Sequence, residues 1–167
     1  IAEEVGPYGR IFATDMSHRS VDIVNNRIAK QGHKHVNILH DEDHAIRVHP
    51  EIPEVDVITS IAVLGSIQNI DDVLVDMNHR LKTGNRICFV EYDKFFHIIS
   101  NINWLSSDGM IKHIFRRNGF LVSIERKPGL LWEYVFIYGK KVMDVETDVQ
   151  VERLNIEEVH EDLKVFQ

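Results

Sequence analysis

The chain has 167 residues, of which 44% are hydrophobic, and a formal net charge of -7 at pH 7. This length suffices for one domain with a real core, whereas the acidic balance argues against a nucleic-acid partner, which requires a basic face. We find no signal peptide, no apolar run of the roughly 18 residues that a membrane span needs, and a single cysteine, Cys88, so that a cytoplasmic location is the default expectation.

The apolar periodicity predicts strands and helices in alternation. β-Branched runs bounded by turn residues indicate strands, and apolar residues three or four apart indicate helices. The predicted elements are the last turn of a helix (1–5), a strand (10–14), a helix (17–30), a strand (36–39), a strand (55–64), a helix (70–81), a strand (85–91), a helix (108–117) and two strands (120–126 and 132–139). We expect one α/β domain over residues 1–142 and an acidic, partly helical appendage over residues 143–167.

The strongest pattern lies between residues 55 and 93. Two nearly continuous apolar runs flank a helix, which is typical of parallel strands that are buried on both faces. Such a unit places its functional loops at the carboxyl ends of the strands, here residues 62–69 and 91–97. The last two predicted strands are joined by a short Pro128-Gly129 turn, which indicates an antiparallel hairpin.

The order of these elements resembles the class I methyltransferases that use S-adenosylmethionine. The resemblance covers most of residues 9–141 and rests on the strand that ends at Asp15-Met16, the acidic segment 41–43, the strand 55–64, the helix with its Lys82-Thr83-Gly84 turn, and the closing helix and hairpin over 111–140. It implies a three-layer α/β sandwich with a mostly parallel, twisted sheet that ends in an antiparallel hairpin.

One departure from the family pattern concerns the beginning of the domain. The glycine-rich loop that follows the family's first strand is absent from this sequence. In the family's strand order the missing first strand would lie between the strands that end at Asp15 and Leu64. A parallel sheet cannot keep an empty central slot without leaving backbone groups unpaired. We therefore expect an upstream segment, which we favour, or a second chain to supply the strand, and we expect residues 1–167 alone not to bind the cofactor.

The resemblance implies a set of cofactor-binding residues. Asp15 would accept hydrogen bonds from the ribose hydroxyls, although it could equally cap the following helix. One acid of the next segment would face the adenine, with Glu42 the best match by register and Asp41 next, although all three could belong to a solvated loop. The candidates are Asp15, Met16, Asp41, Glu42, Asp43, Ser60, Ile61 and Ala62.

The substrate is expected at residues 92–104. Aromatic side chains beside a carboxylate and an imidazole suit a flat, partly apolar molecule, and Asp93 or His97 is a candidate catalytic base. The alternative is a hydrophobic lid on the sheet. We predict no metal site, because the histidine pairs 33/35 and 40/44 lie in two loops without a thiolate partner.

The function predicted is methyl transfer from S-adenosylmethionine to a small molecule by in-line displacement, in which alignment of donor and acceptor is the enzyme's main contribution. One alternative is a non-catalytic scaffold that docks a partner through the acidic appendage; a homo-oligomer is also compatible with the sequence. A second alternative, a nicotinamide-dependent oxidoreductase, also needs a carboxylate such as Asp15. The antiparallel hairpin and the Leu-Lys-Thr-Gly turn argue against it.

Overall fold

The computed structural model describes residues 1–43, 46–67, 69–96 and 101–145. Its elements are α1 (Ala2–Val5), β1 (Ile11–Asp15), α2 (His18–Gln31), β2 (Val36–His40), β3 (Val55–Ile61), η1 (Leu64–Ser66), α3 (Ile70–Arg80), β4 (Leu81–Asp93), η2 (Asn103–Leu105), α4 (Asp108–Arg117), β5 (Phe120–Pro128) and β6 (Glu133–Lys141). None of the helices described is long and apolar enough to cross a membrane. The acidic appendage from residue 146 onward lies outside the described residues.

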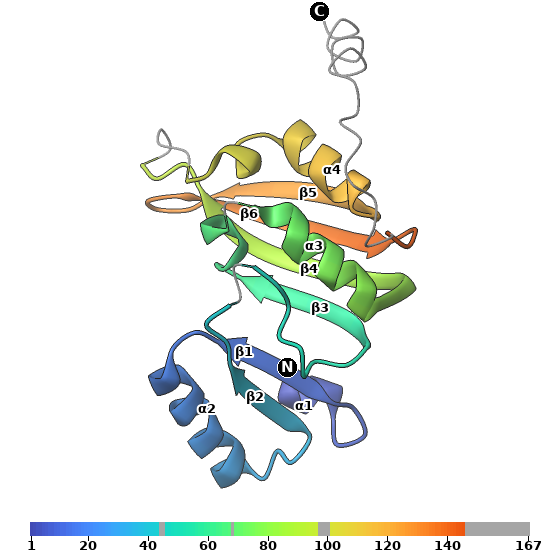
Figure 1. The fold of residues 1–167 in the computed structure, drawn as a ribbon. Helices are drawn as coiled ribbons and strands as arrows, with labels where there is room; N and C mark the ends of the chain where they lie inside the picture. The colour runs from blue at the N-terminus through green and yellow to red at the C-terminus, as the bar shows by residue number, and fades with distance from the viewer. Residues whose placement is uncertain (44–45, 68, 97–100, 146–167) are drawn as a thin grey trace, which may run out of the picture.

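The strands form two separate sheets (Figure 1). β1 and β2 pair in parallel, from Ile11 opposite Val36 to Asp15 opposite His40. The second sheet has the order β3-β4-β6-β5; β3 and β4 are parallel, and β6 runs antiparallel to both of its neighbours. The predicted α/β class and the closing antiparallel hairpin are therefore confirmed. The expected mostly parallel single sheet is matched only in part, since the four-stranded sheet is mixed.

The boundary between the two sheets falls where we expected a strand to be missing. β1 and β3 lie next to each other in Figure 1 and run in the same direction, but they belong to different sheets. On β3, Val57 and Ile61 are 53% and 64% exposed, although the apolar sequence of this strand predicts burial on both faces. An edge strand presents unpaired N–H and C=O groups. The sheet order makes β3 an edge strand among the described residues, and the exposed Val57 and Ile61 show that one face of this strand is uncovered.

The core lies between the four-stranded sheet and the helices α3 and α4, which run along one of its faces (Figure 1). Ser107 begins α4 by accepting a hydrogen bond from the Met110 N–H, and the helix buries an apolar stripe of Ile111, Ile114 and Phe115. The opposite face of the sheet is more open in the described part of the chain. There Leu121 and Tyr138 are 57% and 41% exposed, so the expected third layer is not seen on this sheet.

Two predicted boundaries differ from the structure for local reasons. The strand expected over residues 55–64 ends at Ile61, because Ala62 takes a φ of 57° and the chain enters η1. The turn expected at residues 82–84 lies within β4, where the pairing with β3 moves from Val55–Leu81 to Val57–Arg86 and leaves the intervening residues as a bulge.

The junction of α3 and β4 is held by a buried lysine. Lys141 is 3% exposed, and its Nζ donates hydrogen bonds to the carbonyl oxygens of Asn78 and Leu81, at 2.8 and 2.7 Å. The last carbonyls of a helix have no partner within the helix. Lys141 supplies a donor from β6 to both carbonyls, in addition to the Leu81 N–H that the Asn78 carbonyl accepts, and so stabilises the end of α3.

Candidate functional site

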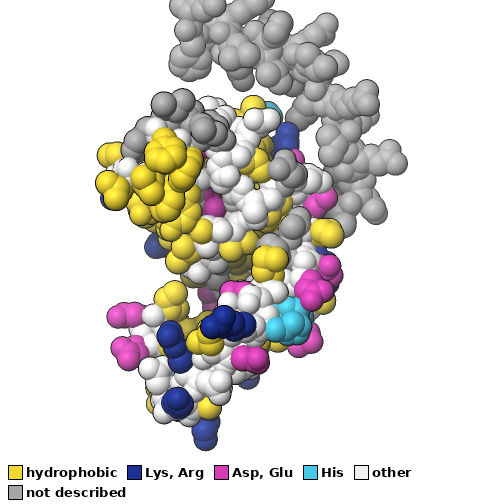
Figure 2. Space-filling view, turned by 90° about the vertical axis from the view of Figure 1, so that its left-hand side faces the viewer, with side chains coloured by type: hydrophobic (Ala, Val, Ile, Leu, Met, Phe, Trp, Pro, Cys, Tyr) yellow, Lys and Arg dark blue, Asp and Glu magenta, His cyan; other side chains and the backbone are white. Residues whose placement is uncertain are grey.

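The carboxyl ends of β1, β2, β3 and β4 lie at one end of the molecule, on the left of Figure 1. Figure 2 looks onto this end: hydrophobic side chains gather on its upper part, and histidine and acidic side chains lie below them. In open α/β sheets ligands bind outside the carboxyl ends of the strands. This end of the molecule is therefore the candidate site.

Asp15, the last residue of β1, has one carboxylate oxygen in use. Its Oδ1 accepts a hydrogen bond from the Ser17 N–H at 2.8 Å, while Ser17 itself caps α2 by accepting the Ser20 N–H at 3.3 Å. No hydrogen bond to Asp15 Oδ2 is formed within the described residues. Asp15 therefore shapes the turn before α2, in line with the alternative role of capping that helix. Its second carboxylate oxygen can still accept a hydrogen bond from a ligand.

The acidic segment after β2 separates into three different environments. Asp41 is 3% exposed; its N–H donates to the Asp15 carbonyl, and its Oδ1 accepts the Asp43 N–H at 3.1 Å. Asp43 forms an ion pair with Arg47 at 2.7 Å. The Glu42 side chain is 76% exposed, and its Oε1 lies 3.8 Å from Nε2 of His40. Glu42 thus has the carboxylate with most freedom to meet a ligand.

The end of β3 combines an unsatisfied polar atom with exposed apolar surface. Ser60 Oγ is buried and has no hydrogen-bond partner in the described part of the chain. Ile61 is 64% exposed. Ala62 has a left-handed backbone, which an L-residue adopts only when its surroundings impose it, and its N–H donates to the Val90 carbonyl at 2.8 Å. These three predicted residues lie together at the edge that faces β1.

A buried carboxylate, which the sequence did not single out as functional, anchors the loop after β3. Glu91 is 1% exposed, and its two oxygens accept the N–H groups of Leu64 and Gly65, each at 3.0 Å. Burial raises the pKa of Glu91, although the hydrogen bonds from the backbone of Gly65, Leu64 and Val63 oppose that shift. The burial of Glu91 could have been inferred from the sequence, because this residue continues the alternation of Ile87 and Phe89, which face the core from β4.

Asp93, a candidate base, lies in a network of charges. It is 1% exposed; Oδ1 accepts the Asn101 N–H at 3.0 Å, and Oδ2 lies 3.3 Å from Nη1 of Arg126. Arg126 also donates to Asp108 and Glu133, each at 2.7 Å. Burial opposes the charge of Arg126, but these carboxylates outweigh it and raise the pKa of the guanidinium. Both oxygens of Asp93 are therefore engaged.

Aromatic residues cluster at the carboxyl end of β4 and in the turn before β6. Tyr92 contacts Trp132 with ring centroids 5.4 Å apart, and Phe95 lies between Phe96 and Trp132, at 4.4 and 6.0 Å. Phe95 and Phe96 are 44% and 57% exposed. Trp104 is instead a core residue, 6% exposed, whose Nε1 donates to the Ile67 carbonyl. His97, the other candidate base, lies outside the described residues.

Several solved structures with a similar fold are methyltransferases, and one is the [4+2]-cyclase SpnF. No family model and no curated protein matches the sequence. A S-adenosylmethionine-dependent methyltransferase of Aquifex aeolicus matches with a TM-score of 0.63 and 16% identity, over 83% of this chain and 73% of that one. An O-methyltransferase of a Brevibacillus brevis polyketide synthase, in complex with S-adenosylhomocysteine, matches with a TM-score of 0.64 and 12% identity, over 83% of this chain and 61% of that one. A phosphoethanolamine N-methyltransferase of Haemonchus contortus matches with a TM-score of 0.65 and 14% identity, over 80% of this chain and 44% of that one.

These similarities show that the chain has the fold of the class I methyltransferases. The chain spans less than two thirds of the second and third of these proteins. Identities of 12 to 16% do not carry activity from one protein to another, because one fold serves many chemistries.

Proposed function

We propose that the protein transfers a methyl group from S-adenosylmethionine to a small, partly apolar molecule. The observation that supports this most directly is a pair of available carboxylates, on Asp15 and Glu42, at the ends of two neighbouring parallel strands. A carboxylate accepts two hydroxyl hydrogen bonds at once, and a second acceptor one strand away suits an amino group on an attached base.

The residues described fit the nucleoside half of this cofactor. Asp15 would hold the ribose hydroxyls and Glu42 the adenine amino group, while the Met16 side chain, 63% exposed, offers apolar surface to the ring. Ser60 Oγ, buried and unpartnered within the described residues, would supply a polar contact to the methionine part of the cofactor. When bound, the cofactor supplies a methyl group that its sulfonium already activates. The protein's own task is then to align the acceptor with that group.

The acceptor is proposed to bind against Tyr92, Phe95 and Phe96. Their exposed rings suit a flat apolar body. A base is needed only where the accepting atom is weakly acidic, and Asp93 and His97 remain the candidates. Because Asp93 already accepts from Asn101 and Arg126, it could take a proton only by giving up one of these bonds. Asp93 would more readily orient Arg126 than act as a base.

A strand between β1 and β3 completes this proposal. The separation of the two sheets supports it, because it leaves the edge of β3 that faces β1 without a paired strand in the described residues. An upstream segment of the same polypeptide is the occupant we favour, and a second chain is the alternative. We therefore expect residues 1–167 by themselves not to bind the cofactor.

The alternative function is a non-catalytic subunit that retains the fold and docks a partner. One observation favours it: Asp93, the candidate base at the end of β4, is already used in the charge network around Arg126. A scaffold needs no available base, and it can use the exposed aromatic surface for contact. The two functions differ in whether the cofactor binds.

The test is calorimetric titration of the native polypeptide with S-adenosylhomocysteine, after its intact mass has been compared with the 19.4 kDa of these residues. We expect saturable binding that Asp15→Asn weakens about tenfold or more, since a hydrogen bond to a charged group contributes about 1.5–3 kcal/mol. The control, Asp22→Asn, removes the same charge from an exposed position on α2 and should bind like the wild type. Absence of binding to a native polypeptide longer than this chain would favour the scaffold. Equal effects of the two substitutions would refute the role of Asp15.

A further inference from the structure

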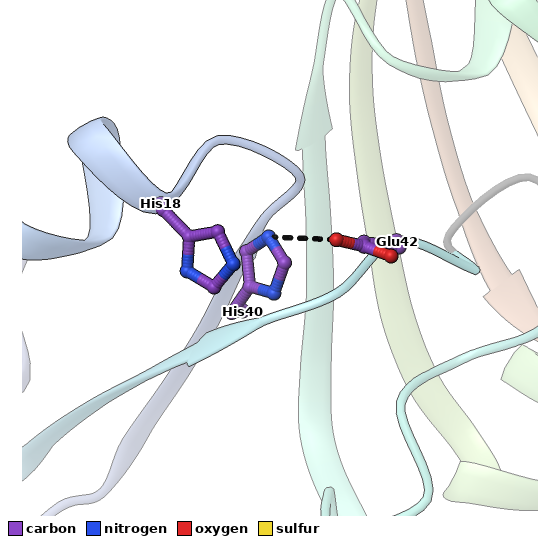
Figure 3. Close-up of side chains that lie close together, drawn as sticks. All are labelled: His18, His40 and Glu42. Atoms are coloured by element: carbon purple, nitrogen blue, oxygen red, sulfur yellow. Dashed lines mark ion pairs between the residues drawn. The ribbon is translucent and has the colours of Figure 1, made fainter.

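Two histidines and a glutamate converge at the carboxyl end of the β1–β2 pair. His18 is the first residue of α2, His40 is the last of β2, and Glu42 lies in the turn that follows. One nitrogen or oxygen atom of each lies within 4.8 Å of those of the other two. Figure 3 shows the two imidazoles face to face, with centroids 3.5 Å apart and 15° between their planes, and Glu42 beside His40.

The backbone that carries these side chains is held by local hydrogen bonds. Ser17 caps α2 immediately before His18. The Asp41 N–H donates to the Asp15 carbonyl at 3.0 Å, which extends the β1–β2 pairing one residue past His40. The Asp41 side chain then accepts the Asp43 N–H, which closes the turn that contains Glu42. The three side chains therefore start from fixed positions and need not be brought together by folding of a loop.

We propose that His18, His40 and Glu42 bind a divalent transition-metal ion, with Zn²⁺ as the best match. This differs from the prediction of no metal site, which rested on the histidine pairs 33/35 and 40/44 and did not include His18. Two imidazole nitrogens and one carboxylate oxygen are a ligand set that Zn²⁺ takes in proteins, with water in the remaining positions. Zinc–ligand bonds of roughly 2.0–2.2 Å place tetrahedral ligand atoms about 3.4 Å apart, so the present cluster, with its atoms within 4.8 Å, has to contract. The two stacked rings also have to turn out of their parallel arrangement, so that a nitrogen of each points at the ion. His18 and Glu42 are exposed and can make this movement through side-chain rotation.

The surrounding charges favour a cation at this position. Asp15 and Asp41 lie on the same strand ends, and Asp43 is the only acid of the segment that a described arginine neutralises. His40 Nε2 lies 2.9 Å from the Met16 carbonyl, so this nitrogen carries a proton that it donates. Coordination through Nε2 would replace that hydrogen bond and leave the ring proton on Nδ1. Zn²⁺ binding is thus expected to shift the NMR signals of the His40 ring as well as those of the more exposed His18 ring.

A second histidine pair provides an internal comparison. His33 and His35 pack edge to face with centroids 5.6 Å apart, and His35 Nε2 contacts the Ala2 carbonyl at 3.0 Å. No carboxylate joins this pair as a third ligand within the described residues. Weak binding to scattered histidines would be the background of a metal titration for a chain with ten of them. The His33→Ala variant therefore serves as the control for that background.

The test is calorimetric titration of the native polypeptide with ZnCl₂ in a buffer without chelators. We expect one saturable site, which His18→Ala weakens by at least about tenfold, because even residues that only support a metal ligand usually contribute tenfold or more. Glu42→Gln should weaken binding in the same direction. His33→Ala should leave the affinity unchanged. Glu42 cannot bind the ion and the adenine amino group proposed above at the same time, so Zn²⁺ and the cofactor would compete for this carboxylate. Because Zn²⁺ is the only probe in the titration, its result does not depend on whether the cofactor binds.

A second readout separates ligation from loss of structure. In imidazole ¹⁵N NMR spectra, Zn²⁺ should shift the ring signals of His18 and His40 and leave those of His33 in place. The proposal is overturned if no saturable binding occurs. It is also overturned if His33→Ala weakens binding as much as His18→Ala, which would mean diffuse binding to surface histidines. The proposal is likewise overturned if the ring signals of His18 and His40 do not change at saturation.

Discussion

The loop after β3 should depend on the Glu91 carboxylate, and Glu91→Gln tests this without a change of shape. The carboxylate is 1% exposed and accepts two backbone N–H groups at 3.0 Å. A glutamine keeps one acceptor but turns an NH₂ group toward the other N–H. The lost bond to a charged acceptor costs about 1.5–3 kcal/mol, and the N–H left without a partner adds about 1–3 kcal/mol.

Relief of the buried charge offsets part of this loss. The raised pKa of Glu91 shows that burial outweighs the stabilisation from its hydrogen bonds, so a neutral side chain regains some free energy. We therefore expect a net loss of about 2 kcal/mol in the free energy of unfolding, or a Tm lower by about 4–8 °C for a chain of this size.

Urea unfolding at pH 7 measures this loss, and amide hydrogen exchange at Leu64 and Gly65 locates it. The control is Glu125→Gln, which removes an equal charge from an exposed ion pair with Lys127 and should change stability by about 0.5 kcal/mol or less. If Glu91→Gln and the control cost the same, or if exchange at Leu64 and Gly65 does not become faster, the carboxylate does not anchor this loop.

Two further changes test the packing around β6. Lys141→Met should destabilise the fold by about 2–4 kcal/mol in urea unfolding, because two buried carbonyls at the end of α3 lose a charged donor; the exposed Lys140→Met serves as the control, and equal losses would refute the capping role. Burial disfavours the charge of Glu133, but hydrogen bonds from Arg126 and Lys94 outweigh it and lower its pKa below 4.5. Its contribution is therefore present above pH 4.5 and lost as the pH falls through the lowered pKa. The stability difference between wild type and Glu133→Gln should shrink across that acid range, and a difference that grows there would contradict the assignment.

Much of the fold could be predicted because its signals are local. The helix 108–117 and its Ser107 cap, and the end of α2 at Gly32 with a φ of 71°, are encoded within a few residues of each element. The antiparallel hairpin followed from the length of one turn. Apolar periodicity and capping depend on neighbours in sequence, so a single sequence contains them.

The candidate site could be predicted only in outline. Asp15 and the segment 41–43 were identified from their position at strand ends, but the sequence could not show that Asp41 is buried and Glu42 exposed. Nor did it show that Asp93 meets Arg126, 33 residues away, or that Glu91 holds the backbone of Leu64. Such contacts depend on the register and burial of strands that are distant in the chain.

The sequence by itself determined which segments are strands and helices and which strand ends carry acids, since periodicity and turn chemistry act over a few residues. Only the tertiary structure decided that the strands form two sheets, that β6 lies between β4 and β5, and that His18 stacks on His40. The physical reason is that these features arise from pairing between distant segments. A side chain's charge state and availability are set by what that pairing brings beside it.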